Sequence, residues 1–81
     1  MTIVLSDAVI EALKDVPPPV QRAFNKQLRF LAQNLFHPSL RAKKYGGASD
    51  IWQARVTRDW RLYFRILGNA YVITALIPHP K

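Results

Sequence analysis

Residues 51–66 read IWQARVTRDWRLYFRI, and this stretch decides the fold. Bulky apolar residues alternate there with glutamine, arginine and tyrosine on both sides of the pair Arg58-Asp59. A period of two predicts β-strands at about 51–57 and 60–66, and the short break between them suits a hairpin. A third strand-like run, YVITALI at 71–77, follows Leu67-Gly68-Asn69-Ala70. The stretch therefore predicts an antiparallel sheet in the second half of the chain.

The alternation also sorts the side chains of the first two strands by face. One face receives the apolar set, which is Trp52, Ala54, Val56, Trp60, Leu62, Phe64 and Ile66, and the other receives Gln53, Arg55, Arg61, Tyr63 and Arg65. Burying three guanidinium groups would require acidic partners, and the acids nearby are Asp50 and Asp59. The arginines are therefore expected to face solvent or a ligand. The third run is apolar on both faces, which suits a central or covered strand and leaves the facing of His79 open.

The first half of the chain predicts a short strand and two helices. Thr2 to Leu5 is β-branched and apolar, and Ser6 is a candidate N-cap for a helix whose apolar stripe ends at Val16. Pro19 can open a second helix that ends before Pro38, with an apolar stripe at Val20, Phe24, Leu28, Leu31 and Leu35. Residues 37–50 form a connection with Gly46-Gly47 as its pivot. The expected fold is α+β, in the order β-α-α-β-β-β over a single domain of residues 1–81, with two N-terminal helices packed on one face of an antiparallel sheet.

The charge is distributed unevenly along the chain. The formal net charge is +7, but residues 1–15 carry a balance of −2 and the remaining residues a balance of +9. This asymmetry favours a polyanionic partner, either nucleic acid or an acidic protein segment, over a solvated basic surface. Cysteine is absent, and no apolar run approaches the roughly 20 residues of a membrane span. A cytoplasmic protein without membrane contact is expected.

Candidate site residues lie in three places. Arg41, Lys43, Lys44 and Tyr45 form a basic and aromatic cluster ahead of the central strands, where extended phosphate contacts would be made. Tyr45 and Tyr63 could stack on unpaired bases. His79, in the segment IPHPK, is either an exposed bystander or a group that exchanges protons near neutral pH. His37 is expected to be structural or solvent-exposed.

Several chemistries are excluded by composition. The chain has no cysteine nucleophile and no glycine-rich phosphate loop with its lysine. Two carboxylates after residue 15 are too few for a two-metal nuclease. Any phosphodiester cleavage would therefore proceed without a metal or another cofactor, with the RNA 2′-hydroxyl as nucleophile and arginine and lysine as charge stabilisers.

The pattern W-x-x-R-V-T-R-D-W-R-L-Y-F-R-I, followed by a last strand and I-P-H, resembles the RelE/ParE toxin superfamily of type II toxin–antitoxin systems, and its HigB and YoeB branches in particular. The resemblance implies that Arg55 and Arg61 contact phosphate and that His79 is a general acid or base. It implies that Lys43 and Lys44 contact substrate, with Arg41, Tyr45, Tyr63 and Arg65 around them. Three features depart from these branches: no acidic residue lies between Asp15 and Asp50, Trp52 and Ala54 stand where the RelE branch has lysines, and Pro78 stands where HigB proteins often have tyrosine.

The function implied by this resemblance is that of a toxin that inhibits translation. It would be a ribosome-dependent, metal-independent mRNA endonuclease that leaves 2′,3′-cyclic phosphate ends. Its partners would be a cognate antitoxin, mRNA and the ribosome, with operator DNA reached through the antitoxin. The alternatives are a ParE-like toxin that inhibits DNA gyrase without nuclease activity, and a non-toxic relative that acts as a basic binding module.

Overall fold

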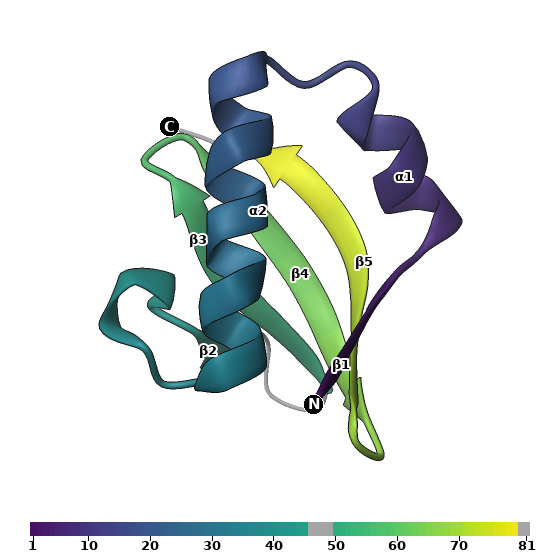
Figure 1. The fold of residues 1–81 in the computed structure, drawn as a ribbon, viewed down its shortest axis with the longest axis vertical. Helices are drawn as coiled ribbons and strands as arrows, with labels where there is room; N and C mark the ends of the chain where they lie inside the picture. Colours follow the sequence, from purple (N-terminus) through teal and green to yellow (C-terminus); the bar gives the residue numbers. More distant parts are fainter. Residues whose placement is uncertain (46–49, 80–81) are drawn as a thin grey trace.

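The computed structural model describes residues 1–45 and 50–79, so the predicted Gly46-Gly47 pivot lies outside the described residues. Its elements are β1 (Thr2–Leu5), α1 (Asp7–Leu13), α2 (Pro18–Gln33), the 3₁₀ turn η1 (Pro38–Leu40), β2 (Lys43–Lys44), β3 (Ile51–Thr57), β4 (Trp60–Leu67) and β5 (Ala70–Pro78). The sheet order is β1-β5-β4-β3-β2, and both helices lie on one face of the sheet (Figure 1). The predicted α+β class and the placement of the helices are confirmed. No helix in the described ranges is long and apolar enough to cross a membrane.

The sheet is mixed because its first strand pairs in parallel with its last. The register of β1 on β5 runs from Thr2 opposite Ala70 to Leu5 opposite Ile73. The pairings of β3 with β4 and of β4 with β5 are antiparallel, as the hairpin pattern predicted, and the pairing of β2 with β3 is antiparallel as well. β2, which the sequence placed in a connection, adds a short strand at the opposite edge. β4 therefore occupies the centre of the sheet.

Both helices end earlier than their apolar stripes predicted. Ser6 caps α1 as expected, with its Oγ accepting the Val9 N–H at 3.3 Å, but α1 stops at Leu13. α2 stops at Gln33 because Asn34 adopts an extended conformation. The Asn34 Oδ1 then accepts the Phe36 N–H at 3.0 Å, a local turn that competes with the helical pattern. The chain leaves α2 at a defined point and turns toward η1.

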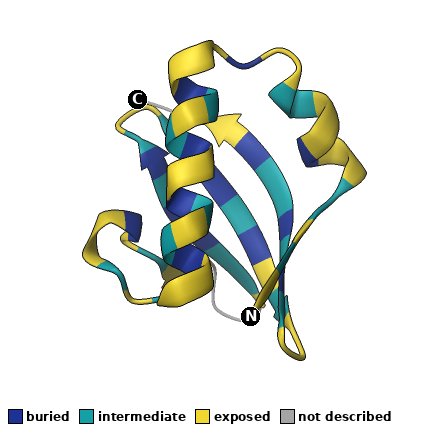
Figure 2. Ribbon diagram, in the orientation of Figure 1, coloured by how far each residue is buried: buried dark blue, intermediate teal, exposed yellow. Residues whose placement is uncertain are grey.

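The core lies between α2 and the sheet. Its fully buried side chains include Phe24 and Leu31 from α2 and Leu62 and Phe64 from β4 (Figure 2). The predicted apolar face packs there as a whole: Ala54, Val56, Leu62 and Phe64 are buried, and Trp52, Trp60 and Ile66 are partly buried against them. The opposite face of β3 and β4, which carries the arginines, is therefore not covered by the helices.

A β-bulge in β5 places Ile73 and Leu76 on the same face of the sheet, although they are three residues apart. The register passes from Tyr63 opposite Ala75 to Phe64 opposite Ile73, which leaves Thr74 as an extra residue. A bulge of this kind reverses the alternation of side chains beyond it. Ile73 and Leu76 consequently both point into the core, where both are buried. The residues that follow Leu76 therefore point to the face opposite the one that simple alternation from Ile73 would give them.

Candidate functional site

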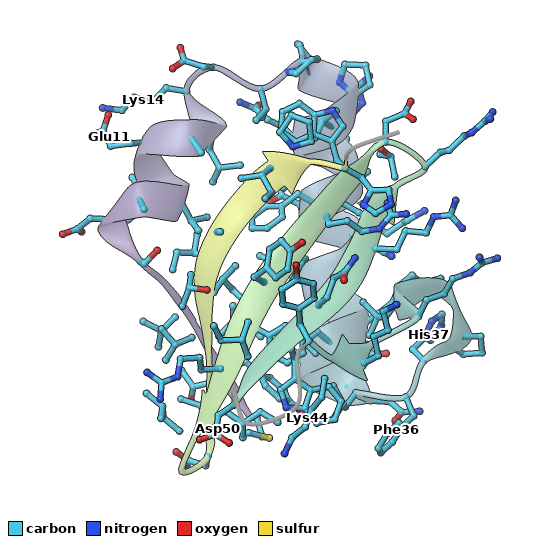
Figure 3. All side chains as sticks on the ribbon, turned by 180° about the vertical axis from the view of Figure 1, so that it is seen from behind. Glu11, Lys14, Phe36, His37, Lys44 and Asp50 are labelled. Carbon is cyan, nitrogen blue, oxygen red and sulfur yellow. The ribbon has the colours of Figure 1, made fainter. Side chains whose placement is uncertain are left out.

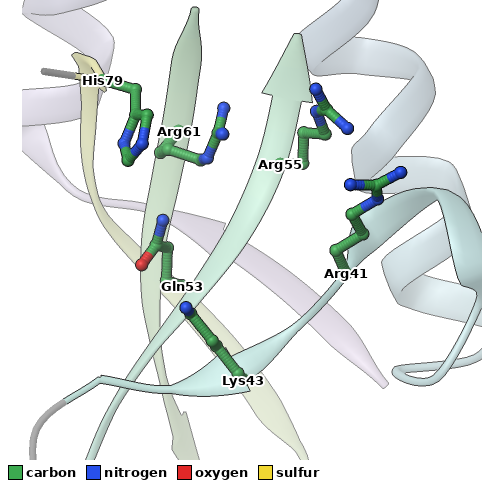
Figure 4. Close-up of a pocket in the computed structure, with 6 residues that line it drawn as sticks. All are labelled: Arg41, Lys43, Gln53, Arg55, Arg61 and His79. Carbon is green, nitrogen blue, oxygen red and sulfur yellow. The ribbon is translucent and has the colours of Figure 1, made fainter. Parts of the chain in front are cut away.

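A hollow of about 280 Å³ opens on the face of the sheet that carries Arg55 and Arg61, opposite the helices. Six residues line it, drawn in Figure 4: Arg41, Lys43, Gln53, Arg55, Arg61 and His79. They come from four separate segments, namely the end of η1, β2, the β3–β4 hairpin and the end of β5. The hollow thus joins the basic cluster ahead of the sheet, the strand arginines and the C-terminal histidine in one place.

The β3–β4 register places Arg55 and Arg61 directly opposite each other. Residues that face each other across an antiparallel pair lie on the same side of the sheet, with Cβ atoms about 4.5–5.5 Å apart. Like charges in such a pair usually destabilise a sheet. The pairing therefore has a cost in the free protein that an anion bound between the two guanidinium groups would remove.

The turn between β3 and β4 anchors Arg61. Its Nη1 donates to the backbone carbonyls of Thr57 at 2.7 Å, Trp60 at 3.0 Å and Arg58 at 3.1 Å. All of its hydrogen bonds to the described part of the chain involve this one nitrogen. Its Nε and Nη2 are left to donate to a ligand, from a side chain held between His79 and Arg55 (Figure 4).

His79 reaches the hollow because of the bulge in β5. Beyond the bulge, Ile77 stands opposite Arg61, so that His79, two residues on, falls on the arginine face. The His79 backbone N–H donates to the Asp59 carbonyl at 2.7 Å, which extends the strand pairing by one step. The imidazole consequently lies beside Arg61 at one end of the hollow (Figure 4).

Arg41 and Lys43 form the opposite wall of the hollow. Arg41 ends η1 with φ 47° and ψ 43°, a left-handed conformation that costs a non-glycine residue of the order of 1 kcal/mol. Lys43 stands opposite Gln53 in the β2–β3 pair. Gln53 itself is only 8% exposed and supplies an amide to the hollow. Sequence reasoning placed Gln53 on the arginine face but did not include it among the site residues, although that facing was the available signal.

The hollow carries an excess of positive charge. Partial burial, and then the positive charges of Arg55 and Arg41, lower the pKa of Arg61 below its ordinary value. Within residues 1–45 and 50–79, the ion pair is the surface contact of Lys14 with Glu11 on α1, and no carboxylate pairs with a cation of the hollow. In the same ranges, no three His, Asp or Glu side chains gather as a metal site. The positive charge of the hollow is thus left for a ligand to neutralise.

Four residues proposed from the sequence lie outside the hollow. Lys44 stands opposite Trp52, on the face that carries the helices, and is labelled near one end of the sheet in Figure 3. Arg65 stands opposite Ile51, further along β4 than the residues of the hollow, and is exposed. The rings of Tyr45 and Tyr63 meet edge to face with centroids 5.5 Å apart. Because Tyr63 is also opposite Gln53, this aromatic pair borders the hollow.

His37 occupies a different part of the molecule from His79. Its ring stacks on Phe30 at a centroid distance of 3.9 Å, with an angle of 7° between the ring planes. Its Nδ1 accepts the Ser39 N–H at 3.2 Å, which caps η1. These contacts give His37 the structural role expected for it.

Arg55→Gln is expected to stabilise the free protein. Removing one of two facing charges should raise the free energy of unfolding by about 0.2–1 kcal/mol, or the midpoint of thermal unfolding by roughly 1–8 °C at low salt. Inorganic phosphate should raise the midpoint of the parent and have little effect on the variant. The matched change Arg65→Gln, outside the hollow, should alter neither quantity appreciably. Thermal unfolding of the parent and both variants, with and without phosphate, measures these midpoints. A midpoint of Arg55→Gln below that of the parent in phosphate-free buffer would contradict the expectation.

Comparison with known proteins identifies the class of fold to which this chain belongs. No family model matches the sequence, and no match is found among curated proteins. Among solved structures, the YoeB/ParE toxin from Agrobacterium tumefaciens superposes with a TM-score of 0.81 at 16% identity, covering 99% of this chain and 100% of that one. RelE from the RelE–RelB complex of Pyrococcus horikoshii gives a TM-score of 0.82 at 20% identity, covering 99% and 96%. The chain has the RelE/YoeB toxin fold.

The RelE/YoeB fold extends to more distant sequences as well. YafQ from Escherichia coli superposes with a TM-score of 0.74 at 13% identity, covering 94% of this chain and 90% of that one. The predicted resemblance is therefore confirmed for the fold, across nearly the whole chain. At these identities the likeness is one of backbone architecture, so that the chemistry of the hollow has to be argued from its own residues.

Proposed function

We propose that this protein is the toxin of a type II toxin–antitoxin system and cleaves mRNA on the ribosome without a metal. The observation that carries the proposal is the hollow itself. Three arginines, a lysine and a histidine converge on one open face of a RelE/YoeB fold, and no carboxylate in the described part of the chain pairs with them. Phosphate oxygens are the ligands that such an arrangement suits best.

In the proposed reaction, Arg61 and Arg55 hold the scissile phosphate between β4 and β3. The 2′-hydroxyl oxygen of the preceding nucleotide attacks phosphorus, and its proton passes to water. The bond from phosphorus to the 5′-oxygen breaks, and His79 donates a proton to that oxygen as it leaves. The products are a 2′,3′-cyclic phosphate and a 5′-hydroxyl. The two guanidinium groups stabilise the additional negative charge on the phosphoryl oxygens in the transition state.

The residues around the reacting phosphate would bind the flanking nucleotides. Arg41 and Lys43, on the opposite wall of the hollow, are placed for a neighbouring phosphate. Tyr45 and Tyr63 at its border offer aromatic surface on which an unpaired base can stack. Lys44 and Arg65 would contribute longer-range attraction from outside the hollow.

The proposed protein partner is a cognate antitoxin that covers the hollow with an acidic or amphipathic segment. RelE of Pyrococcus horikoshii was solved with RelB, and YoeB of Staphylococcus aureus with YefM. Operator DNA would be reached through the antitoxin, and the toxin would act in the cytoplasm without a cofactor.

Induced expression in a bacterial host, with mapping of mRNA 5′-ends, tests the proposal. Protein synthesis should stop within minutes of induction, and new 5′-hydroxyl ends should accumulate within translated messages. Loss of DNA synthesis ahead of translation, with messages intact, would instead indicate a toxin directed at gyrase. Normal growth at full expression would indicate a basic binding module. Either of these outcomes would overturn the assignment as an mRNA endonuclease.

A further inference from the structure

Gln27 is a buried amide beneath the sheet. It lies on α2 and is only 3% exposed. Within the described ranges, the buried polar side chains are those of Gln27 and Gln53. Its Nε2 donates to the carbonyl of Ser39 at 2.9 Å and to the carbonyl of Arg55 at 2.8 Å. Its Oε1 accepts the Ser39 hydroxyl at 3.1 Å. A single side chain thus makes three hydrogen bonds to two segments far from it in sequence.

These three bonds define the orientation of the amide. Two carbonyl oxygens can only accept, so they require the NH₂ group, which is a double donor, and the Ser39 hydroxyl then donates to the amide oxygen. A reversed amide would direct its oxygen at two other oxygens and leave its NH₂ group buried without those acceptors, at a large cost. The two carbonyls therefore determine the orientation of the amide, and the Ser39 hydroxyl adds a second bond between Gln27 and η1.

The Arg55 carbonyl points to an edge where no strand continues. The carbonyl of Ile51 accepts the Tyr45 N–H at 2.7 Å on the side of β2, and alternate carbonyls of a strand point the same way. The carbonyl of Arg55, four residues on, therefore points to that edge as well, but β2 pairs only as far as Gln53. Gln27 supplies the donor that the missing strand would have supplied.

At its other end, the Gln27 amide holds η1. Ser39 lies two residues before Arg41, the residue that turns the chain toward β2 in a left-handed conformation. The guanidinium groups of Arg41 and Arg55 line the same hollow, where their charges repel each other. This repulsion favours separation of Arg41 from Arg55, and the Gln27 amide joins the backbone segments beside them.

We propose that Gln27 is a positioning residue of the site, which sets the spacing between the guanidinium groups of Arg41 and Arg55 by binding the backbone beside each of them. The proposal deepens the phosphate-binding role of the hollow and rests on that role for its effect on RNA. Gln27 does not line the hollow, because α2 packs on one face of the sheet (Figure 1) and the residues of the hollow lie on the opposite face. A displacement near 1 Å in such a site can lower a rate by as much as about 10²-fold.

The test uses two variants and a matched control. Gln27→Met keeps the length of the side chain and removes all three bonds. Ser39→Ala removes only one of the two bonds by which the amide holds η1, at an exposed residue whose replacement is compatible with folding. Gln21→Met is the control, because Gln21 also lies on α2 and also donates its amide to a backbone carbonyl, that of Leu13, away from the hollow.

The first readout is the set of arginine Nε–Hε resonances in ¹⁵N NMR spectra of the free protein. The Arg41 and Arg55 signals should shift in Gln27→Met, and shift less in Ser39→Ala, while those of Arg22 and Arg65 stay in place. Gln21→Met should leave the Arg41 and Arg55 signals unchanged. Because no ligand is present, this result does not depend on whether the protein cleaves RNA. Unchanged Arg41 and Arg55 signals in folded Gln27→Met or Ser39→Ala would overturn the proposal.

The second readout is single-turnover cleavage of mRNA by folded protein on ribosomes. Gln27→Met should lower the rate constant at saturating enzyme by about 10- to 100-fold, because Arg55 is displaced from the scissile phosphate. It should also weaken RNA binding, because Arg41 is displaced from the neighbouring phosphate. In an Arg55→Gln background, the same substitution should lower the rate constant far less, because the group it positions is absent. A full additional loss in that background would show a general structural defect and overturn the positioning role. A parent that does not cleave at all would count against the proposed function, while the NMR result would still decide the role of Gln27.

Discussion

Arg61→Gln is expected to lower the rate constant for RNA cleavage by about 10²–10³-fold and to abolish growth inhibition at unchanged protein level. The reason is geometric as well as electrostatic. Hydrogen bonds from Nη1 to the carbonyls of the β3–β4 turn hold the guanidinium group in place, so its remaining donors reach the phosphate without reorganisation. Single-turnover cleavage of a defined message on purified ribosomes measures the loss directly.

Arg65→Gln is the control for this experiment. Arg65 lies on the same strand and the same face as Arg61, so both variants lose one positive charge from one surface of β4. Arg65 lies outside the hollow, and its replacement should cost only a few-fold, mostly in binding at low salt. Equal losses from the two variants would mean that the basic face acts through its overall charge, and the hollow would lose its assignment as the cleavage site.

His79→Ala is expected to lower the rate constant for cleavage by about 10²–10⁴-fold, the usual contribution of a general acid. The backbone N–H of His79 binds the Asp59 carbonyl whatever the side chain, so the end of β5 should stay in place in the variant. The loss should therefore appear in the chemical step and not in the affinity for RNA. Titration of the RNA-binding affinity, alongside single-turnover rates, separates these two effects.

A modified substrate makes the role of His79 specific. When sulfur replaces the bridging 5′-oxygen at the scissile bond, the leaving thiolate needs no proton, so the variant should cleave this substrate nearly as fast as the parent does. His37→Asn serves as the second control. Asparagine can still cap η1, and the His37 ring stacks on Phe30, outside the hollow. If the sulfur substrate does not rescue His79→Ala, His79 is not the general acid.

Much of the fold could be predicted because its local signals agree with one another. Alternation from Ile51 to Ile66 predicted the β3–β4 hairpin and the division of its side chains into a core face and an arginine face, and the structure confirms both. Thr57 is the exception, because a bulge after Arg55 pairs it with Trp60 of the apolar set. Ser6 before an acidic first turn predicted the start of α1. The helix ends were less well predicted, because the side-chain hydrogen bond at Asn34 ends α2 while the apolar spacing continues to Leu35.

Most residues of the candidate site could be predicted from the sequence, but not how the fold brings them together. The hydrophobic pattern of each strand puts Arg55 and Arg61 on the open face. Their position opposite each other depends on a further bulge, between Arg55 and Thr57, because a regular hairpin with Thr57 opposite Trp60 would pair Arg55 with Leu62. Simple alternation from Ile73 would place His79 on the helix-bearing face. The extra residue at Thr74 reverses that outcome, and the bulge has no local signal because YVITALI is apolar on both faces.

Local sequence thus determines which basic residues this protein has and on which face of the hairpin they lie, because strand alternation is a property of adjacent residues. Long-range pairing decides the rest. The parallel pairing of β1 with β5, the bulge at Thr74, the left-handed turn at Arg41 and the Gln27 amide all depend on segments far apart in the chain. The physical reason is that each of them is stabilised by contacts that exist only once the sheet and α2 have packed together.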